Sequence, residues 1–174
     1  RGVIERYEPF VVSEHLAWSR RGGVYHPDLL PIPRNAEMLS RVCAHIDEAQ
    51  EALGRRLLIE NPTAYLALAD HQWDEVEFLV EIARRTGCGL LVDVNNVYVS
   101  AANMGLSAEA WIDRVPGDLV GEIHLAGHRP AAAPRDALPI DTPDPPAAAP
   151  VRAPHLPLTP PTGPPPAPLP PRRA

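Results

Sequence analysis

The sequence has no lysine, only two cysteines and no long apolar run. Its 16 basic residues are all arginine, they form no dense cluster, and the formal net charge is −6 at pH 7. This charge pattern disfavours a surface for nucleic acid or another polyanion, and we expect no nucleic-acid partner. No apolar stretch approaches the roughly 20 residues that a membrane span needs, so no membrane partner is expected either.

The two cysteines lack the spacing of a metal or redox motif, and no secretory context accompanies them. Cys43 falls in a helix-like segment and Cys88 at the start of a strand-like one. Both are interpreted as small, buried apolar residues. The N-terminus also lacks a charged-then-apolar signal pattern, and these features together predict a cytoplasmic protein.

Proline divides the sequence into two parts. Of the 23 prolines, 17 lie between Pro130 and Pro171. Proline removes backbone donors and blocks both helices and central strands, so residues 130–174 are predicted to form a Pro/Ala-rich, mostly disordered tail. At most a short strand is expected near residues 138–141. Residues 1–129 are predicted to form the folded domain.

The first part alternates between strand-like and helix-like patterns. Strands are predicted near residues 9–15, 55–60, 89–94 and 119–125. Helices are predicted over residues 35–53 and over residues 74–86, and a shorter one starts at Ser107 and ends before Pro116. Asn35 and Asp74 are the expected N-caps, and Gly54 and Gly87 the expected stops. The alternation predicts an α/β fold with a parallel sheet, and the continuous apolar runs are typical of strands buried on both faces.

Each predicted strand ends on a residue of a metal-binding type: His15, Glu60, Asp93 and His124. The carboxyl ends of neighbouring parallel strands open on one face, so these side chains are expected to converge there. Two imidazoles and two carboxylates would form a site suited to iron, manganese or zinc. Asn96, three residues after Asp93, would bring a further oxygen ligand from a loop.

Simpler roles stay open for each of these residues. A histidine at a strand end is usually structural, Glu60 could pair with an arginine, and Asn95 and Asn96 could be turn formers. However, Glu60 precedes an Asn-Pro turn, so its carboxylate is predicted to point into the strand-end cleft. Burying that carboxylate alone would cost several kcal/mol. Glu122 is predicted on the same strand face as His124. The strand-end positions together favour a metal site.

At these residues the sequence closely resembles the multinuclear non-heme iron-dependent oxidases, the methanobactin-biosynthesis oxidase family, long catalogued as a domain of unknown function. The matching stretches occur in order between residues 9 and 128. They include Ser-Glu-His-Leu-Ala-Trp-Ser (13–19), Asp-Leu-Leu-Pro-Ile-Pro (28–33), Leu-Ile-Glu-Asn-Pro (58–62), Gly-Leu-Leu-Val-Asp-Val-Asn-Asn-Val-Tyr (89–98) and Glu-Ile-His-Leu-Ala-Gly-His (122–128).

The resemblance implies a TIM barrel of the xylose-isomerase-like kind, of which this sequence would form a partial barrel of about four to five parallel β/α units. It implies two or three iron ions at the strand ends, and oxidation of cysteine or other residues of ribosomally made peptides by dioxygen. A small partner protein often presents the precursor peptide. The metal-ligand positions of the family match His15, Glu60, Asp93, Asn96 and His124, and Glu60 is expected to bridge two irons.

The resemblance also has departures. The family's first strands, which bring another histidine and an acidic residue, would precede the region present here. The segment 138–146 is similar to the family's Ile-Asp-Thr-His-Asp-His-Pro, with prolines at both histidine positions. Asp141 would remain a ligand, whereas its partner is replaced by Pro143. We therefore expect one weakly bound iron and impaired oxidase activity. The alternatives are a divalent-metal sugar isomerase-like barrel enzyme and a non-catalytic remnant.

Overall fold

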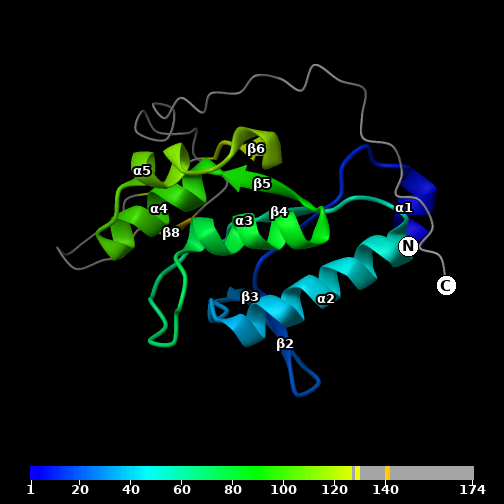
Figure 1. The fold of residues 1–174 in the computed structure, drawn as a ribbon, viewed down its shortest axis with the longest axis horizontal. Helices are drawn as coiled ribbons and strands as arrows, with labels where there is room; N and C mark the ends of the chain where they lie inside the picture. The colour runs from blue at the N-terminus through cyan, green and yellow to red at the C-terminus, as the bar shows by residue number, and fades with distance from the viewer. Residues whose placement is uncertain (127, 130–139, 142–174) are drawn as a thin grey trace.

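The computed structural model describes residues 1–126, 128–129 and 140–141 (Figure 1). The helices are α1 (Gly2–Tyr7), α2 (Ala36–Leu53), α3 (Glu75–Thr86), α4 (Val94–Met104) and α5 (Ala108–Asp113), with a 3-10 turn at Gly117–Leu119. The strands are β1 (Ser13–His15), β2 (Trp18–Arg21), β3 (Val24–Leu30), β4 (Leu58–Glu60), β5 (Gly89–Asp93), β6 (Val120–His124), β7 (His128–Arg129) and β8 (Ile140–Asp141). The predicted disorder of the proline-rich tail concerns residues that lie outside the described ones, apart from β8.

Four strands form one parallel sheet in the order β1-β4-β5-β6. This confirms the predicted α/β class, and the sequential order of parallel strands is that of consecutive units of a β/α barrel. His15 pairs in register with Glu60, and Asp93 pairs with His124. β7 and β8 form a separate antiparallel pair, so the described residues add no fifth strand to the parallel sheet.

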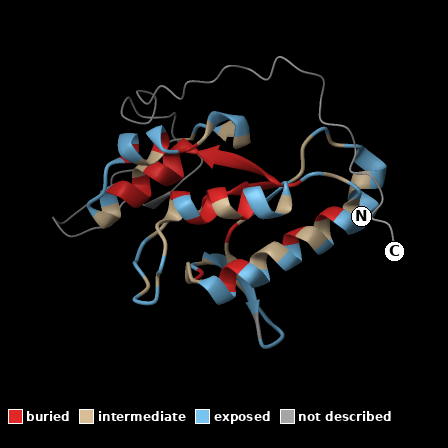
Figure 2. Cartoon of the chain, viewed as in Figure 1, coloured by how far each residue is buried: buried red, intermediate tan, exposed pale blue. Residues whose placement is uncertain are grey.

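One face of the sheet packs against the helices. Ile59, Leu90 and Val92 are buried in a single apolar cluster together with residues of α2, α3, α4 and α5. Because side chains alternate along a strand, Glu60 and Asp93 are directed to the opposite face. Figure 2 shows the burial concentrated on β5, α4 and one side of α3, while the β2–β3 hairpin is exposed. α2 and α3 lie side by side along the sheet (Figure 1).

The predicted helix boundaries are confirmed by their caps. The Asn35 side chain accepts a hydrogen bond from the Met38 amide (2.9 Å), and α2 ends at Gly54 with φ 62°. α3 ends in the same way at Gly87, with φ 70°. Both glycines take the left-handed conformation that side chains disfavour. Among the described residues, no helix has the length and apolarity needed to cross a membrane.

Three expectations need correction. Asn95 and Asn96 do not form a turn or a loop, because they lie in the first turn of α4. The segment after His15 contains a β-hairpin, β2–β3, that the strand pattern did not predict. Of the two cysteines, Cys88 is buried but Cys43 is only partly buried. Burial raises the pKa of both thiols.

We predict that Asp74→Ala destabilises the fold by about 1 kcal/mol, because α3 loses its N-cap. The Asp74 carboxylate accepts a hydrogen bond from the Glu77 amide (3.0 Å) and pairs with Arg114. Partial burial raises the pKa of Asp74, but the hydrogen bonds from Arg114 and Glu77 outweigh it and hold that pKa below its usual value. A carboxylate whose pKa is lower in the folded state than in the unfolded state stabilises the fold at pH values above its unfolded-state pKa. This contribution is lost as pH falls through the folded-state pKa.

Denaturant unfolding of the parent and of Asp74→Ala, at neutral pH and at successively lower pH, measures this effect. The difference in the free energy of unfolding between the parent and Asp74→Ala should decrease as the pH falls. Asn35→Ala is the matched control, because it removes an uncharged cap from α2. Asn35 also donates a long hydrogen bond to the Asp70 carboxylate (3.3 Å), so its cost should fall in acid less than that of Asp74→Ala. A cost of Asp74→Ala that stays constant into acid would contradict the assignment.

Candidate metal centre

Three strand ends bring acidic and imidazole groups together at the carboxyl edge of the sheet. The ligand-type atoms of Glu60, Asp93 and His124 all lie within 4.8 Å of one another. His124 Nδ1 is 3.8 Å from Glu60 Oε1 and 3.9 Å from Asp93 Oδ2. Two nitrogen or oxygen ligands of one ion, each bonded at about 2.1 Å, can lie up to roughly 4.2 Å apart. The separation of His124 from each carboxylate therefore lies within the span of two ligands on one ion.

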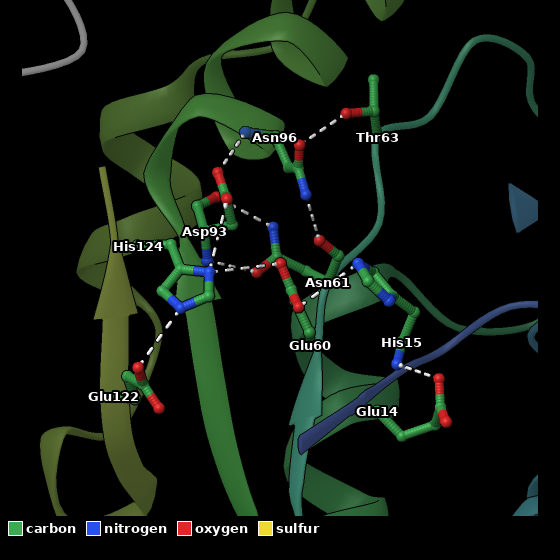
Figure 3. A network of polar contacts seen from close by, with 9 residues as sticks. All are labelled: Glu14, His15, Glu60, Asn61, Thr63, Asp93, Asn96, Glu122 and His124. Atoms are coloured by element: carbon green, nitrogen blue, oxygen red, sulfur yellow. Dashed lines mark hydrogen bonds and ion pairs between the residues drawn. The ribbon is translucent and has the colours of Figure 1, made fainter. Parts of the chain in front are cut away.

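His15 lies on the other side of Glu60. Its Nε2 is 3.3 Å from Glu60 Oε2, whereas His124 faces Oε1 of the same carboxylate. Figure 3 shows the Glu60 carboxylate between the two imidazoles. The Glu60 side chain is only 8% exposed, while those of His15 and His124 are 38% and 45% exposed. A buried carboxylate thus offers one oxygen to each of two accessible histidines.

Asp93 has a structural role as well as a position in the cluster. Its Oδ1 accepts a hydrogen bond from the Asn96 amide (2.8 Å) and so caps α4. Its Oδ2 is the oxygen that faces His124. The helix cap therefore fixes the carboxylate rotation and directs the second oxygen toward the cluster.

Asn61 joins the ends of β4 and β5. Its side-chain amide donates to the Asp93 carbonyl (3.1 Å), and its side-chain oxygen accepts from the Asp93 amide (2.9 Å). Asn96 Nδ2 donates to the Asn61 carbonyl (3.0 Å), and Thr63 donates to Asn96 Oδ1 (2.7 Å). All of these groups are at least partly buried, and Figure 3 shows them as one connected network. The network holds Glu60 and Asp93 at fixed positions relative to each other.

The structure thus brings four of the predicted ligands together: His15, Glu60, Asp93 and His124. Asn96 lies beside them and lines the same cavity, but both ends of its amide are engaged in the network. Its role as a metal ligand remains a prediction. Asp141 lies in β8, paired with His128, and its side chain is outside what the structure describes. Sequence reasoning missed Asn61 and Thr63, although the Asn-Pro turn directly after Glu60 was a signal for the first.

The cluster forms the floor of an open cavity of about 560 Å³. Polar groups lie at the floor, whereas Leu29, Tyr65 and Leu125 contribute apolar surface to the walls. These three side chains are all substantially exposed. The carboxylates and imidazoles are therefore reached from solvent through this cavity.

The donor set is chemically selective. Imidazole nitrogens with carboxylate oxygens suit iron, manganese and zinc, whereas an all-oxygen set would suit magnesium or calcium. Both carboxylates are buried, at 8% and 11% side-chain exposure for Glu60 and Asp93, so a cation among them would offset their charge. The residues present therefore fit a first-row divalent metal ion.

The fold and the site together define an α/β protein with a candidate metal centre at the carboxyl ends of its parallel strands. Residues 1–165 match the family described as the RiPP precursor modification enzymes MbnB/TglH/ChrH. The chain belongs to this family, whose description concerns modification of ribosomally made precursor peptides. The family that the sequence resembles is thereby confirmed.

Curated relatives are similar over most of the chain. A UPF0276 protein of Caulobacter vibrioides is 55% identical over 146 residues, which cover 84% of this chain and 52% of the relative. A UPF0276 protein of Bordetella pertussis is 53% identical over 147 residues, covering 84% and 51% respectively. The chain thus spans about half the length of these relatives, and their names state no activity.

Proposed function

We propose that this protein takes part in the iron-dependent oxidation, by dioxygen, of cysteine or other residues in a ribosomally made precursor peptide. The observation that carries the proposal is the Glu60, Asp93 and His124 cluster, with His15 on the second oxygen of Glu60. The family description supports a precursor peptide as substrate. Iron as the metal and oxidation as the reaction are what the sequence resemblance to the family implies for this chain.

The residues would hold the metal in a defined way. His124 Nδ1, Glu60 Oε1 and Asp93 Oδ2 face a common position, and His15 Nε2 with Glu60 Oε2 defines a second position beside it. Glu60 faces both positions, so it would be a ligand of the one weakly bound iron expected here in either of them. When bound, iron would supply one-electron redox chemistry and a binding position for a substrate thiolate.

The protein's own groups would position the reactants. Asn61 and the α4 cap hold Asp93 in a fixed orientation, which limits the reorganisation needed when a metal binds. The apolar walls at Leu29, Tyr65 and Leu125 would contact the peptide on either side of the reacting residue. A small partner protein that presents the precursor peptide belongs to the same proposal.

Anaerobic reconstitution tests the proposal. The chain is loaded with Fe(II), Mn(II) or Zn(II) in parallel, and metal per chain is measured after desalting. Each form is then exposed to dioxygen with a cysteine-containing peptide and, as a control, its serine counterpart. We expect iron to bind and only the iron form to change the mass of the cysteine peptide, slowly, because Pro143 stands where the family has a histidine.

Electrons lost by the peptide must reduce dioxygen, so oxygen uptake and the change in peptide mass should rise together. Metal binding without oxygen uptake, combined with conversion of a sugar by the manganese form, would favour the isomerase-like alternative. Failure of all three metals to bind would support the non-catalytic alternative.

A further inference from the structure

We infer that Glu122 is a positioning residue for the candidate metal centre, because it fixes the proton on the His124 ring. The inference rests on the proposed function in that it assigns a metal to the space that His124 faces. Glu122 and His124 are two residues apart on β6, so their side chains emerge on the same face of the strand. Figure 3 shows Glu122 on the side of the ring away from Glu60 and Asp93.

The two ring nitrogens of His124 have different surroundings. Nε2 is 3.2 Å from Glu122 Oε1, which is within hydrogen-bond reach. Nδ1 is 3.8 Å from Glu60 Oε1 and 3.9 Å from Asp93 Oδ2, beyond that reach. A carboxylate only accepts hydrogen bonds, so Nε2 must donate to Glu122 and carry the proton. In the neutral ring, the Nδ1 lone pair is then directed at the metal position.

This arrangement has two consequences for metal binding. A histidine that already has the required tautomer does not need to transfer its proton between the ring nitrogens when the metal binds. The hydrogen bond from Nε2 to Glu122, on the same strand as His124, also restricts rotation of the ring. A carboxylate on the far nitrogen further raises the electron density at the ligating nitrogen. Among the described residues, the His15 ring has no such second carboxylate, and its Nε2 faces Glu60 directly.

The chain provides a matched control in Glu14. Glu14 also precedes a site histidine, His15, but its carboxylate accepts a hydrogen bond from the His15 backbone amide (3.0 Å) rather than from the ring. Glu14 is exposed and lies on β1, next to β4 in the same sheet. A variant of Glu14 therefore removes the same charge at a similar distance in sequence, without touching an imidazole.

The experiment measures Co(II) binding and ring tautomer in the parent, Glu122→Ala, Glu122→Gln and Glu14→Ala. We expect Glu122→Ala to weaken Co(II) binding about 10- to 100-fold and to alter the Co(II) visible spectrum. Glu122→Gln should bind nearly as well as the parent, because its amide oxygen still accepts from Nε2. Glu14→Ala should match the parent. In metal-free parent protein, long-range ¹H–¹⁵N spectra should show the neutral His124 ring protonated at Nε2.

The outcomes separate this inference from the proposed function. Parent-like Co(II) binding in Glu122→Ala, or a His124 ring protonated at Nδ1 in the parent, would overturn the inference. A loss in Glu122→Gln as large as that in Glu122→Ala would also overturn it, because the charge of Glu122, and not its hydrogen bond to the ring, would then support metal binding. If the parent binds no metal, the proposed function fails, whereas the metal-free spectra still test the tautomer.

Discussion

Glu60→Gln is expected to abolish most metal binding while leaving the fold intact. The substitution keeps the shape of the side chain but removes the charge that offsets a cation. Each Glu60 oxygen faces one histidine, at 3.3 Å for His15 and 3.8 Å for His124, so both predicted metal positions lose a ligand together. The loss should therefore exceed the roughly 10- to 100-fold typical of residues that only support a ligand. Iron per chain after anaerobic reconstitution measures it.

Glu75→Gln is the matched control. Glu75 is a carboxylate on α3, and its Oε2 accepts a hydrogen bond from the Trp111 indole (2.8 Å). Burial raises the pKa of Glu75, so its charge destabilises the fold increasingly as pH rises above the unfolded-state pKa. Glu75→Gln should thus keep full iron content and be at least as stable as the parent at neutral pH. Equal iron content in Glu60→Gln and Glu75→Gln would show that Glu60 is only a structural carboxylate.

The positions of the candidate ligands could be predicted because parallel sheets obey a simple rule. A run such as Leu-Leu-Val-Asp must end at the edge where neighbouring strands also end, and the register confirms this for Asp93 with His124 and for His15 with Glu60. Side-chain alternation then places all four on one face. Neither argument needs tertiary detail, so the sequence alone is enough to predict where these four side chains lie.

The supporting network could not be predicted in the same way. Asn95 and Asn96 are of a type common in turns, but here they lie in the first turn of α4, which Asp93 caps. Asn61 pairs with Asp93 across 32 positions of sequence, and no local pattern encodes such a contact. The β2–β3 hairpin, unlike this network, has a local signal in the sequence. Gly22 and Gly23, at φ 56° and 82°, separate its two strands. A Gly-Gly pair between such runs is a hairpin signal that could have been read.

The structure also shows why the site and the fold depend on each other. Asp93 caps α4 with one oxygen and faces His124 with the other. Any change that lets this carboxylate rotate therefore weakens a helix and displaces a predicted ligand. Asn61 supports this arrangement, because it holds the Asp93 backbone at both its amide and its carbonyl.

Asn61→Ala should accordingly destabilise the protein and weaken metal binding at the same time. Asn61 is 2% exposed, and its removal takes a buried hydrogen-bond partner from two backbone groups of Asp93. Each such loss costs about 1–3 kcal/mol, so we expect the free energy of unfolding to fall by about 3 kcal/mol. Iron affinity should fall about 10- to 100-fold, because the Asp93 carboxylate loses its fixed orientation.

Gln50→Ala separates the two effects. Gln50 is 3% exposed and also forms hydrogen bonds with two backbone groups, donating to the Thr86 carbonyl (2.9 Å) and accepting from the Leu57 amide (3.0 Å). These hydrogen bonds lie at the start of β4, at the opposite end of the strand from Glu60. Urea unfolding should therefore give similar losses of stability for the two variants, whereas iron titration at low temperature should show weaker binding only in Asn61→Ala. Equal iron affinities in Asn61→Ala and Gln50→Ala would mean that Asn61 supports the fold without positioning Asp93 for the metal.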